Sequence, residues 1–288
     1  MSPAESLDQK ILILDLNIME VVNKHASGVL IVGPPGGGKS YRVGKSVKDV
    51  DCAYAPTQST PLAFYRFIYL NRSELIIVDD SADGFRDSKI QAMTKALVWP
   101  HPVTQKFTVS WNSTSNVLER DALPQEFDFE GRIIFIANTT PANIHAQAIR
   151  SRLNVVHYDL SIEEKKVLMR QIIDGKNRLD LRPEQGQELL EFIFRRVNPA
   201  TKNFDLRLLE KAAIHYNAYP NQWKILVGNM LDSDPRYETL ERLFGTQLSV
   251  EDQAKEFERE TGFKRRTFFD LRQQWGLTGK QTALLHNA

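Results

Sequence analysis

Short, continuous apolar runs alternate with helical stretches along the first 159 residues of the chain. Such runs are typical of strands buried on both faces of a parallel sheet, and the stretches between them are typical of covering helices. One of these helices has a readable start, because Thr60 can cap it and Pro61 suits its first position. The predicted strands are residues 29–32, 51–55, 75–78, 133–137 and 155–158.

After residue 160 the strand pattern gives way to signals for helix starts and ends. Ser161 and Glu164 have the spacing of a capping box, and Pro183 can open a helix that ends before Asn198. Two further helices are predicted over residues 205–216 and 222–231.

These changes of pattern divide the chain into three predicted parts. The first is an α/β core in residues 1–159, and the second is an all-helical domain in residues 160–245. Ser249 offers another helix cap, so residues 246–288 form a small carboxyl-terminal module of their own.

Composition narrows the class of protein only slightly. The 288 residues are 42% apolar and 25% charged with a formal net charge of +1, which excludes a disordered or broadly basic chain. The single cysteine, Cys52, has no intramolecular partner, and acidic residues interrupt the amino-terminal apolar stretch, unlike a secretory signal. Both features lead us to expect a cytoplasmic location. Since no apolar run approaches about 20 residues, we also expect no membrane span.

The strongest motif is GPPGGGKS, which fits G-x-x-x-x-G-K-S between a predicted strand and a predicted helix. Glycines let backbone N–H groups turn around phosphates, Lys39 reaches the β and γ phosphates, and Ser40 ligates magnesium. A second GKS at residues 44–46 lacks the required upstream glycine. The predicted phosphate-contacting residues are Gly33, Pro34, Pro35, Gly36, Gly37, Gly38, Lys39, Ser40 and Tyr41.

Two aspartates follow the apolar run at residues 75–78. Asp79 is the predicted magnesium-side acid, because a buried strand delivers its terminal carboxylate to the metal. Asp80 is then placed to orient or deprotonate the attacking water, with a helix-cap or loop role as the alternative. The predicted ligands are ATP and Mg²⁺.

With three further features, these residues resemble the AAA+ ATPase family over residues 28–230. The resemblance implies a P-loop core of three layers with a parallel sheet, followed by a helical lid. It makes Asn138, after RIIFIA, the sensor 1 residue at the tip of a strand lying between the two nucleotide motifs. It makes Arg207, in FDLRLLEKA, the sensor 2 residue.

The segment AIRSRL is similar to the arginine-finger segment of clamp loaders and related ATPases. Arg152 matches the finger best, and Arg150 is the rival. Because a finger acts on the γ phosphate of a neighbouring subunit, the resemblance implies a ring or helical homo-oligomer, of hexamer type.

The sequence departs from the AAA+ pattern at Asp80, where most members carry glutamate. Paired aspartates and the IANTTP segment are similar to superfamily 3 viral helicases, whereas the SRL segment and the lid favour the clamp-loader and initiator side. The compact build resembles ATPases of phages or mobile elements, which would place the protein in a bacterium or a phage-infected host cell.

An insertion between residues 99 and 131 precedes the predicted sensor strand. KFTVSW alternates as a strand should, and NSTS is typical of a turn. By resemblance to initiators and superfamily 3 helicases, this hairpin would face a central pore with Lys106 as a DNA contact. Packing against a neighbour is the alternative.

The carboxyl-terminal segment predicts a helix-turn-helix around Gly262. Its expected inward residues are Phe257, Phe263, Phe268 and Leu271. Its acidic first half is followed by a basic second half, which can lie in a DNA groove through Lys264, Arg265, Arg266 and Arg272. The alternative is that the two helices pack on the lid and present a solvated basic face.

Together these features predict an AAA+ ATPase that couples ATP hydrolysis at subunit interfaces to DNA remodelling or to loading of a replication protein. It would act as a helicase loader or helicase, with a replication or recombination protein as partner. Alternatives are a protein-directed remodeller, a transposition-type DNA-binding regulator and a switch that hydrolyses ATP poorly. The loop APTQST lacks the aromatic-hydrophobic pair expected of an unfoldase.

Overall fold

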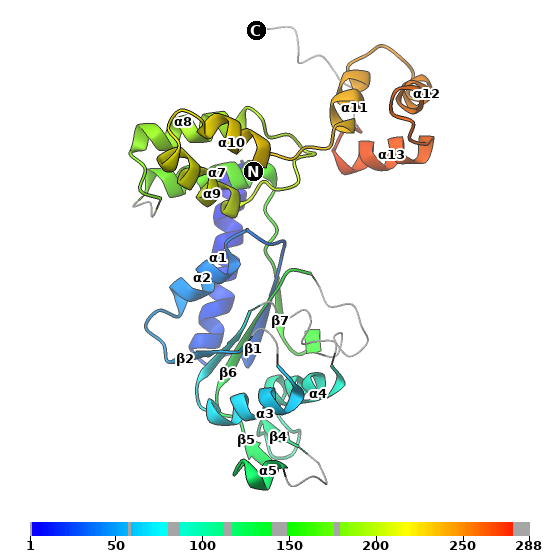
Figure 1. Ribbon diagram of the computed structural model, residues 1–288. Coiled ribbons are helices and arrows are strands. Elements are labelled where there is room, and N and C mark those ends of the chain that lie inside the picture. The colour runs from blue at the N-terminus through cyan, green and yellow to red at the C-terminus, as the bar shows by residue number, and fades with distance from the viewer. Residues whose placement is uncertain are drawn as a thin grey trace. The chain divides into compact units, whose positions relative to one another are not determined.

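The computed structural model describes residues 2–56, 59–79, 87–111, 117–139, 149–175 and 179–278. Contacts divide the chain into two compact units, Met1–Glu164 and Lys165–Ala288. Unit 1 is a mixed α/β unit and unit 2 is built from helices (Figure 1).

Five strands of unit 1 form a parallel sheet in the order β2-β3-β6-β1-β7. The predicted parallel sheet is therefore confirmed, and each predicted strand corresponds to an observed one with ends shifted by one residue or less. The strand that precedes Asn138 lies between the strands that precede the two nucleotide motifs, as the family resemblance implies. The strands are β1 Gly28–Val32, β2 Cys52–Tyr54, β3 Leu75–Val78, β6 Arg132–Ala137 and β7 Asn154–His157.

Helices cover both faces of this sheet (Figure 1). Leu30 of β1 and Phe135 of β6 share a core with α3 and α4, whereas α1 contacts β1, β6 and β7. The predicted cap of α3 is confirmed, because the Thr60 side chain accepts a hydrogen bond from the Ala63 N–H. Among the residues that the structure describes, unit 1 contains the helices α1 Pro3–Val22, α2 Lys39–Ser46, α3 Pro61–Leu70, α4 Ser88–Val98 and α5 Val117–Arg120.

Helix α1 is not anticipated by the sequence pattern. Its buried side chains, Leu7, Leu14, Ile18 and Val21, recur at helical spacing and are fully buried. Further apolar side chains on the same helix, such as Leu16, are exposed and obscure that spacing in the sequence. None of the helices in the described part of the chain has the length and apolar character of a bilayer span.

A small antiparallel hairpin, β4 Thr108–Ser110 with β5 Glu126–Asp128, precedes the central strand β6. The strand predicted from KFTVSW is thus confirmed in part. The NSTS turn lies outside the described residues.

The first helices of the second half begin where the sequence predicts. The capping box before α7 is present, because Glu164 N–H donates to Ser161 Oγ at 3.2 Å and Ser161 N–H donates to Glu164 Oε2 at 2.7 Å. Pro183 occupies the first turn of α8. These helices are α7 Ile162–Asp174, α8 Pro183–Phe194, α9 Leu206–Ala218 and α10 Trp223–Met230.

The last three helices of unit 2 share one core. They are α11 Arg236–Phe244, α12 Val250–Thr261 and α13 Arg265–Gln274. Tyr237 and Leu240 of α11 belong to the same buried cluster as Phe257 and Phe268. The boundary that the sequence predicts after residue 245 would therefore separate α11 from α12 and α13, although these helices pack on each other.

One expected inward residue of the helix-turn-helix is wrong. Phe257, Phe268 and Leu271 are buried, but Phe263 is 45% exposed, with the Arg236 guanidinium 4.5 Å from its ring centroid. Gly262 takes a left-handed φ of 73° and ends α12. Phe263 therefore lies in the turn, where helical periodicity does not decide which side chains face inward.

Candidate nucleotide-binding site

Three predicted site residues lie at one edge of the sheet. β3, β6 and β1 are parallel neighbours, so their carboxyl ends meet at the same edge. Asp79, Asn138 and Gly33 each directly follow one of these strands. Ligands of open parallel sheets bind outside the carboxyl ends of the strands, so this edge is the candidate site.

The GPPGGGKS loop depends on glycine at particular backbone positions. Gly36 and Gly38 have φ values of 73° and 87°, which glycine adopts at little cost. A Cβ at Gly33 would lie 2.0 Å from the Tyr158 carbonyl oxygen, so the loop leaves β1 in close contact with the segment after β7. The glycines of the loop therefore bring backbone, rather than side chains, to the candidate site.

The loop runs directly into α2, which begins at Lys39. The N-cap residue, Gly38, supplies no side-chain hydrogen bond, so the helix start presents backbone N–H groups. Ser40 and Tyr41 lie in this first turn and are exposed. An uncapped helix start after a glycine loop has the donors and the positive potential that suit a phosphate.

Lys39 is a buried cation within this loop, with 5% of its surface exposed. Its Nζ donates to the carbonyl oxygens of Gly33 at 2.6 Å and Pro34 at 2.7 Å, and to Asn138 Oδ1 at 3.4 Å. The structure thus brings the phosphate-loop lysine together with the predicted sensor asparagine. The ammonium group is held where the ends of β1 and β6 meet.

The residues predicted to hold magnesium offer oxygen ligands at the same edge. Asp79 follows β3 and is half-buried, and Ser40 is exposed in the first turn of α2. Mg²⁺ prefers oxygen donors and is commonly bound by one or two protein oxygens together with substrate phosphates. The hydroxyl and the carboxylate therefore fit such an ion. Asp80 lies outside the described residues.

The predicted arginines occupy different parts of the chain. Arg150 and Arg152 lie in the short segment before β7, and both are half-buried. The Arg152 guanidinium lies 5.6 Å from the centroid of the Trp99 ring. Arg207 is exposed in the first turn of α9 in unit 2, and its sensor 2 role stays a prediction.

Lys106, the predicted DNA contact of the insertion, forms an ion pair. Its Nζ lies 2.5 Å from Asp128 Oδ2, across the hairpin. The hydrogen bond from Lys106 lowers the pKa of Asp128, and the same bond raises the pKa of Lys106. Since the lysine is 62% exposed, this surface pair does not prevent it from meeting another anion.

The basic residues of α13 differ in their surroundings. Arg265 pairs with Glu251 of α12, and Arg266 Nε lies 3.7 Å from Asp270 Oδ2. Arg272 Nε donates to the Leu277 carbonyl at 2.5 Å, so this arginine ties α13 to the segment that follows it. Lys264 is exposed at the N-cap of α13.

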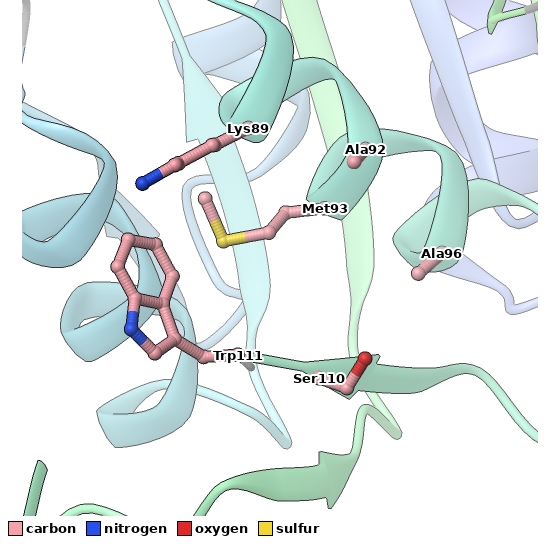
Figure 2. Close-up of a pocket in the computed structure, with 6 residues that line it drawn as sticks. All are labelled: Lys89, Ala92, Met93, Ala96, Ser110 and Trp111. Carbon is pink, nitrogen blue, oxygen red and sulfur yellow. The ribbon is translucent and has the colours of Figure 1, made fainter. Parts of the chain in front are cut away.

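A small cavity lies beside the hairpin, between α4 and β4 (Figure 2). Its volume is about 200 Å³, below the range of about 300–1,000 Å³ that is usual for small-molecule sites. Lys89 Nζ lies 5.2 Å from the centroid of the Trp111 ring. The cavity does not include the residues of the phosphate loop; it is lined by Lys89, Ala92, Met93, Ala96, Ser110 and Trp111.

Sequence reasoning missed residues that support the loop helix from α1. Arg42 of α2 donates to Asp15 of α1 at 3.2 Å and also lies beside Tyr158. Burial is the main reason that the pKa of Tyr158 is raised. The position of Arg42, three residues after Lys39, can be read from the sequence, but its partners cannot, because the sequence pattern does not predict α1.

Comparisons with known proteins add a distant phage relative. No protein-family model matches the chain. A protein of Enterobacteria phage T4, described as an uncharacterized 36.7 kDa protein in the nrdC-mobD intergenic region, is 27% identical over 183 residues. The match covers 58% of this chain and 54% of the phage protein, so the chain spans about half the length of that relative.

Proposed function

We propose that this chain is an ATP-hydrolysing protein of the AAA+ type. The observation that carries the proposal is the meeting of the phosphate loop, Asp79 and Asn138 at one edge of the sheet, with Lys39 bonded to Asn138 at 3.4 Å. A glycine loop alone indicates only a phosphate. The combination adds a metal-side acid and a polar residue for positioning water, which is the requirement for hydrolysing a phosphoanhydride.

The residues of the site divide the reaction between them. Backbone N–H groups from Gly36 to Ser40 bind the phosphates, and Lys39 compensates the charge on the β and γ groups. Asn138 orients the attacking water, and Asp80 is the proposed group that accepts its proton. Ser40 and Asp79 would hold a magnesium ion, which neutralises charge on the phosphate oxygens when it is bound.

We also propose that the active form is an oligomer. Arg152 would reach the γ phosphate bound by the neighbouring subunit, where a positive charge stabilises the transferring group. One subunit then contributes the phosphate loop and the next contributes the finger, so each site lies at an interface.

The proposed link to DNA rests on the last three helices. α12 and α13 meet in a short turn with Gly262 in the left-handed conformation, as in helix-turn-helix motifs. Lys264, Arg265 and Arg266 are exposed at the start of α13. The contacts of Arg265 with Glu251 and of Arg266 with Asp270 are surface ion pairs, which contribute little and leave the two arginines able to meet phosphates. DNA remodelling or helicase loading is accordingly the proposed task.

The direct test compares two lysines of the same helix. Lys39→Ala removes the buried phosphate-loop cation and should lower ATP turnover at least about 100-fold, because electrostatic stabilisation of this kind contributes several kcal/mol. Lys45→Ala removes an exposed lysine from the last turn of α2 and should leave turnover within about twofold of wild type. ATP hydrolysis is measured by phosphate release from the full chain. Undiminished turnover in Lys39→Ala would reject the proposal.

A further inference from the structure

Arg152 lies in a turn that the core of unit 1 holds in place. Ile149 and Leu153, which flank it, are 1% and 7% exposed and belong to the same buried cluster as the end of α4. The Arg152 N–H donates to the Ile149 carbonyl oxygen at 3.0 Å. The backbone position of this arginine is therefore set by buried contacts.

The backbone at Trp99, at the end of α4, is also held by hydrogen bonds and buried neighbours. Its N–H donates to the Lys95 carbonyl oxygen at 3.2 Å. The preceding residue, Val98, is 1% exposed, and its carbonyl oxygen accepts a hydrogen bond from Ser27 Oγ at 2.8 Å. Yet the Trp99 side chain is 54% exposed. The backbone at Trp99 is therefore fixed, while its indole stays accessible to a side chain from another segment.

The described partner of that indole is Arg152. The guanidinium carbon lies 5.6 Å from the ring centroid, within the range of about 6 Å in which a cation is attracted to an aromatic face. The planar guanidinium also stacks on aromatic rings, which an ammonium group does not. Among the contacts between described residues, the arginine that lies over the Trp99 ring is Arg152, not its rival Arg150.

We propose that Trp99 is a positioning residue for the arginine finger, and that Arg152 is that finger. The inference rests on the proposed function. A long arginine side chain loses rotamer entropy when it is ordered at an interface, and an aromatic surface that orders it beforehand reduces that loss. The Trp99 indole thus prepares the guanidinium in the free subunit for the phosphate site of the neighbour.

Steady-state ATP turnover of the full chain tests this role. Trp99→Ala should lower the turnover number about 3- to 30-fold, the range expected from losing one cation–π contact. Its KM for ATP should stay close to wild type, because the phosphate loop is untouched. Arg152→Ala should lower turnover at least about 1,000-fold. Trp99→Phe keeps an aromatic face and should retain most of the wild-type turnover.

Double variants separate positioning from a general structural effect. In an Arg152→Ala background, Trp99→Ala should lower turnover no further, because the side chain that it orders is gone. In an Arg150→Ala background, Trp99→Ala should still lower turnover by its full factor. Equal losses in all backgrounds would overturn the proposal, since they would show that the indole acts independently of Arg152.

Trp111→Ala is the matched control. Trp111 is a second tryptophan of unit 1 that lies beside a cation, Lys89, although it is partly buried whereas Trp99 is exposed (Figure 2). Its loss should leave turnover within about twofold of wild type, with thermal unfolding recorded for every variant. If Arg152→Ala lowers turnover and Trp99→Ala does not, the positioning role is wrong while the proposed function stands. If Arg152→Ala leaves turnover unchanged, the finger assignment fails first and the positioning role fails with it.

Discussion

At the scale of single residues, two buried charged side chains, Lys39 and Glu164, are held by hydrogen bonds from or to polar neighbours. Lys39 has 5% of its surface exposed and lies inside the phosphate loop, where Gly33, Pro34 and Asn138 oxygens accept its hydrogen bonds. Burying a cation costs free energy unless polar partners surround it. The three oxygen acceptors offset that cost, so the charge can stay buried inside the loop.

Glu164 is a second buried charged side chain, and it joins two helices. Its side chain is 3% exposed and accepts hydrogen bonds from Ser6 Oγ at 2.6 Å and Lys10 Nζ at 2.8 Å. Burial by itself would raise the pKa of Glu164, but these bonds and those from Ser161 outweigh it and lower the pKa to about 2. The ionised carboxylate joins the amino end of α1 to the start of α7.

This carboxylate predicts a specific loss of stability in acid. Because its pKa is lowered from 4.5 to about 2 in the folded protein, its stabilising contribution is complete above about pH 4.5 and is lost as the pH falls towards 2. Glu164→Gln should lower the free energy of unfolding at pH 7 by about 1.5–3 kcal/mol, as expected for hydrogen bonds to a charged group. Urea unfolding at pH 7 and pH 3 measures both effects.

The control for this prediction is Glu5→Gln. Glu5 makes the same capping-box contact at the start of α1, but its hydrogen bonds with Ser2 lie at the surface. We expect a much smaller change from Glu5→Gln than from Glu164→Gln. Equal effects of the two substitutions would contradict the role assigned to burial.

At the scale of elements, the ends of helices and strands determine the chemistry. α2 begins without a side-chain cap, immediately after a glycine loop, and so offers its N–H groups to an anion. α13 begins with a run of exposed cations, and its inner face packs through Phe268 and Leu271. Each element combines one buried face that anchors it with one polar end, and it is the polar end that we propose binds a ligand.

The start of α13 yields the prediction for DNA binding. The double variant Lys264→Ala, Arg266→Ala should weaken affinity for double-stranded DNA and reduce the slope of log K against log salt by about two, since each phosphate contact contributes about 0.9. Fluorescence anisotropy over a range of salt concentrations measures the slope. Neither residue belongs to the buried core, so the fold should be retained.

The matched control changes two exposed cations of α12, Lys255→Ala and Arg259→Ala. These removals alter net charge by the same amount but leave the start of α13 intact. The same loss of affinity in both double variants would indicate a general charge effect. An unchanged slope of log K against log salt in the α13 variant would favour the alternative, in which these helices only pack on their own unit.

At the scale of the whole molecule, the chain divides into an α/β unit and a helical unit, each with its own core. If Arg152 acts on the nucleotide bound by the neighbouring subunit, the site of an isolated subunit lacks the positive charge that the finger would supply. An isolated subunit should therefore be a poor ATPase, and activity should depend on assembly.

Mixing two inactive variants tests that dependence. Arg152→Ala subunits keep an intact phosphate loop and Asp79, whereas Asp79→Ala subunits keep an intact finger. In an equal mixture, on the order of a quarter of interfaces combine the two intact halves, and ATP turnover should recover to a comparable fraction of wild type. Phosphate release is measured alongside a size measurement that establishes mixed oligomers. Mixed oligomers without recovered turnover would exclude a finger that acts between subunits.

Much of unit 1 was predictable because its signals are local. The strand at residues 75–78 matches β3, and the loop GPPGGGKS has the glycines that its positive φ values require. Backbone conformation and strand burial depend on neighbouring residues in the chain, so a sequence pattern records them directly. The capping box at Ser161 and Glu164 was readable for the same reason.

Other features depend on residues that are distant in the chain. The exposure of Phe263 is decided by a turn and by Arg236, and the ring contact of Arg152 depends on Trp99. α1 was missed because apolar residues on its exposed side hide the helical spacing of its buried ones. None of these arrangements has a local signature, since each depends on which surfaces meet after folding.

The sequence by itself determined the glycine-rich loop at residues 33–40 and the strand segments, because each is a property of consecutive residues. The strand order that places β6 between β3 and β1 was implied by the resemblance, but only the tertiary structure decided that Asn138 Oδ1 lies 3.4 Å from Lys39 Nζ. It also decided that Arg152 rests on Trp99. The physical reason is that packing selects strand order and side-chain partners over the whole unit, whereas backbone conformation is selected residue by residue.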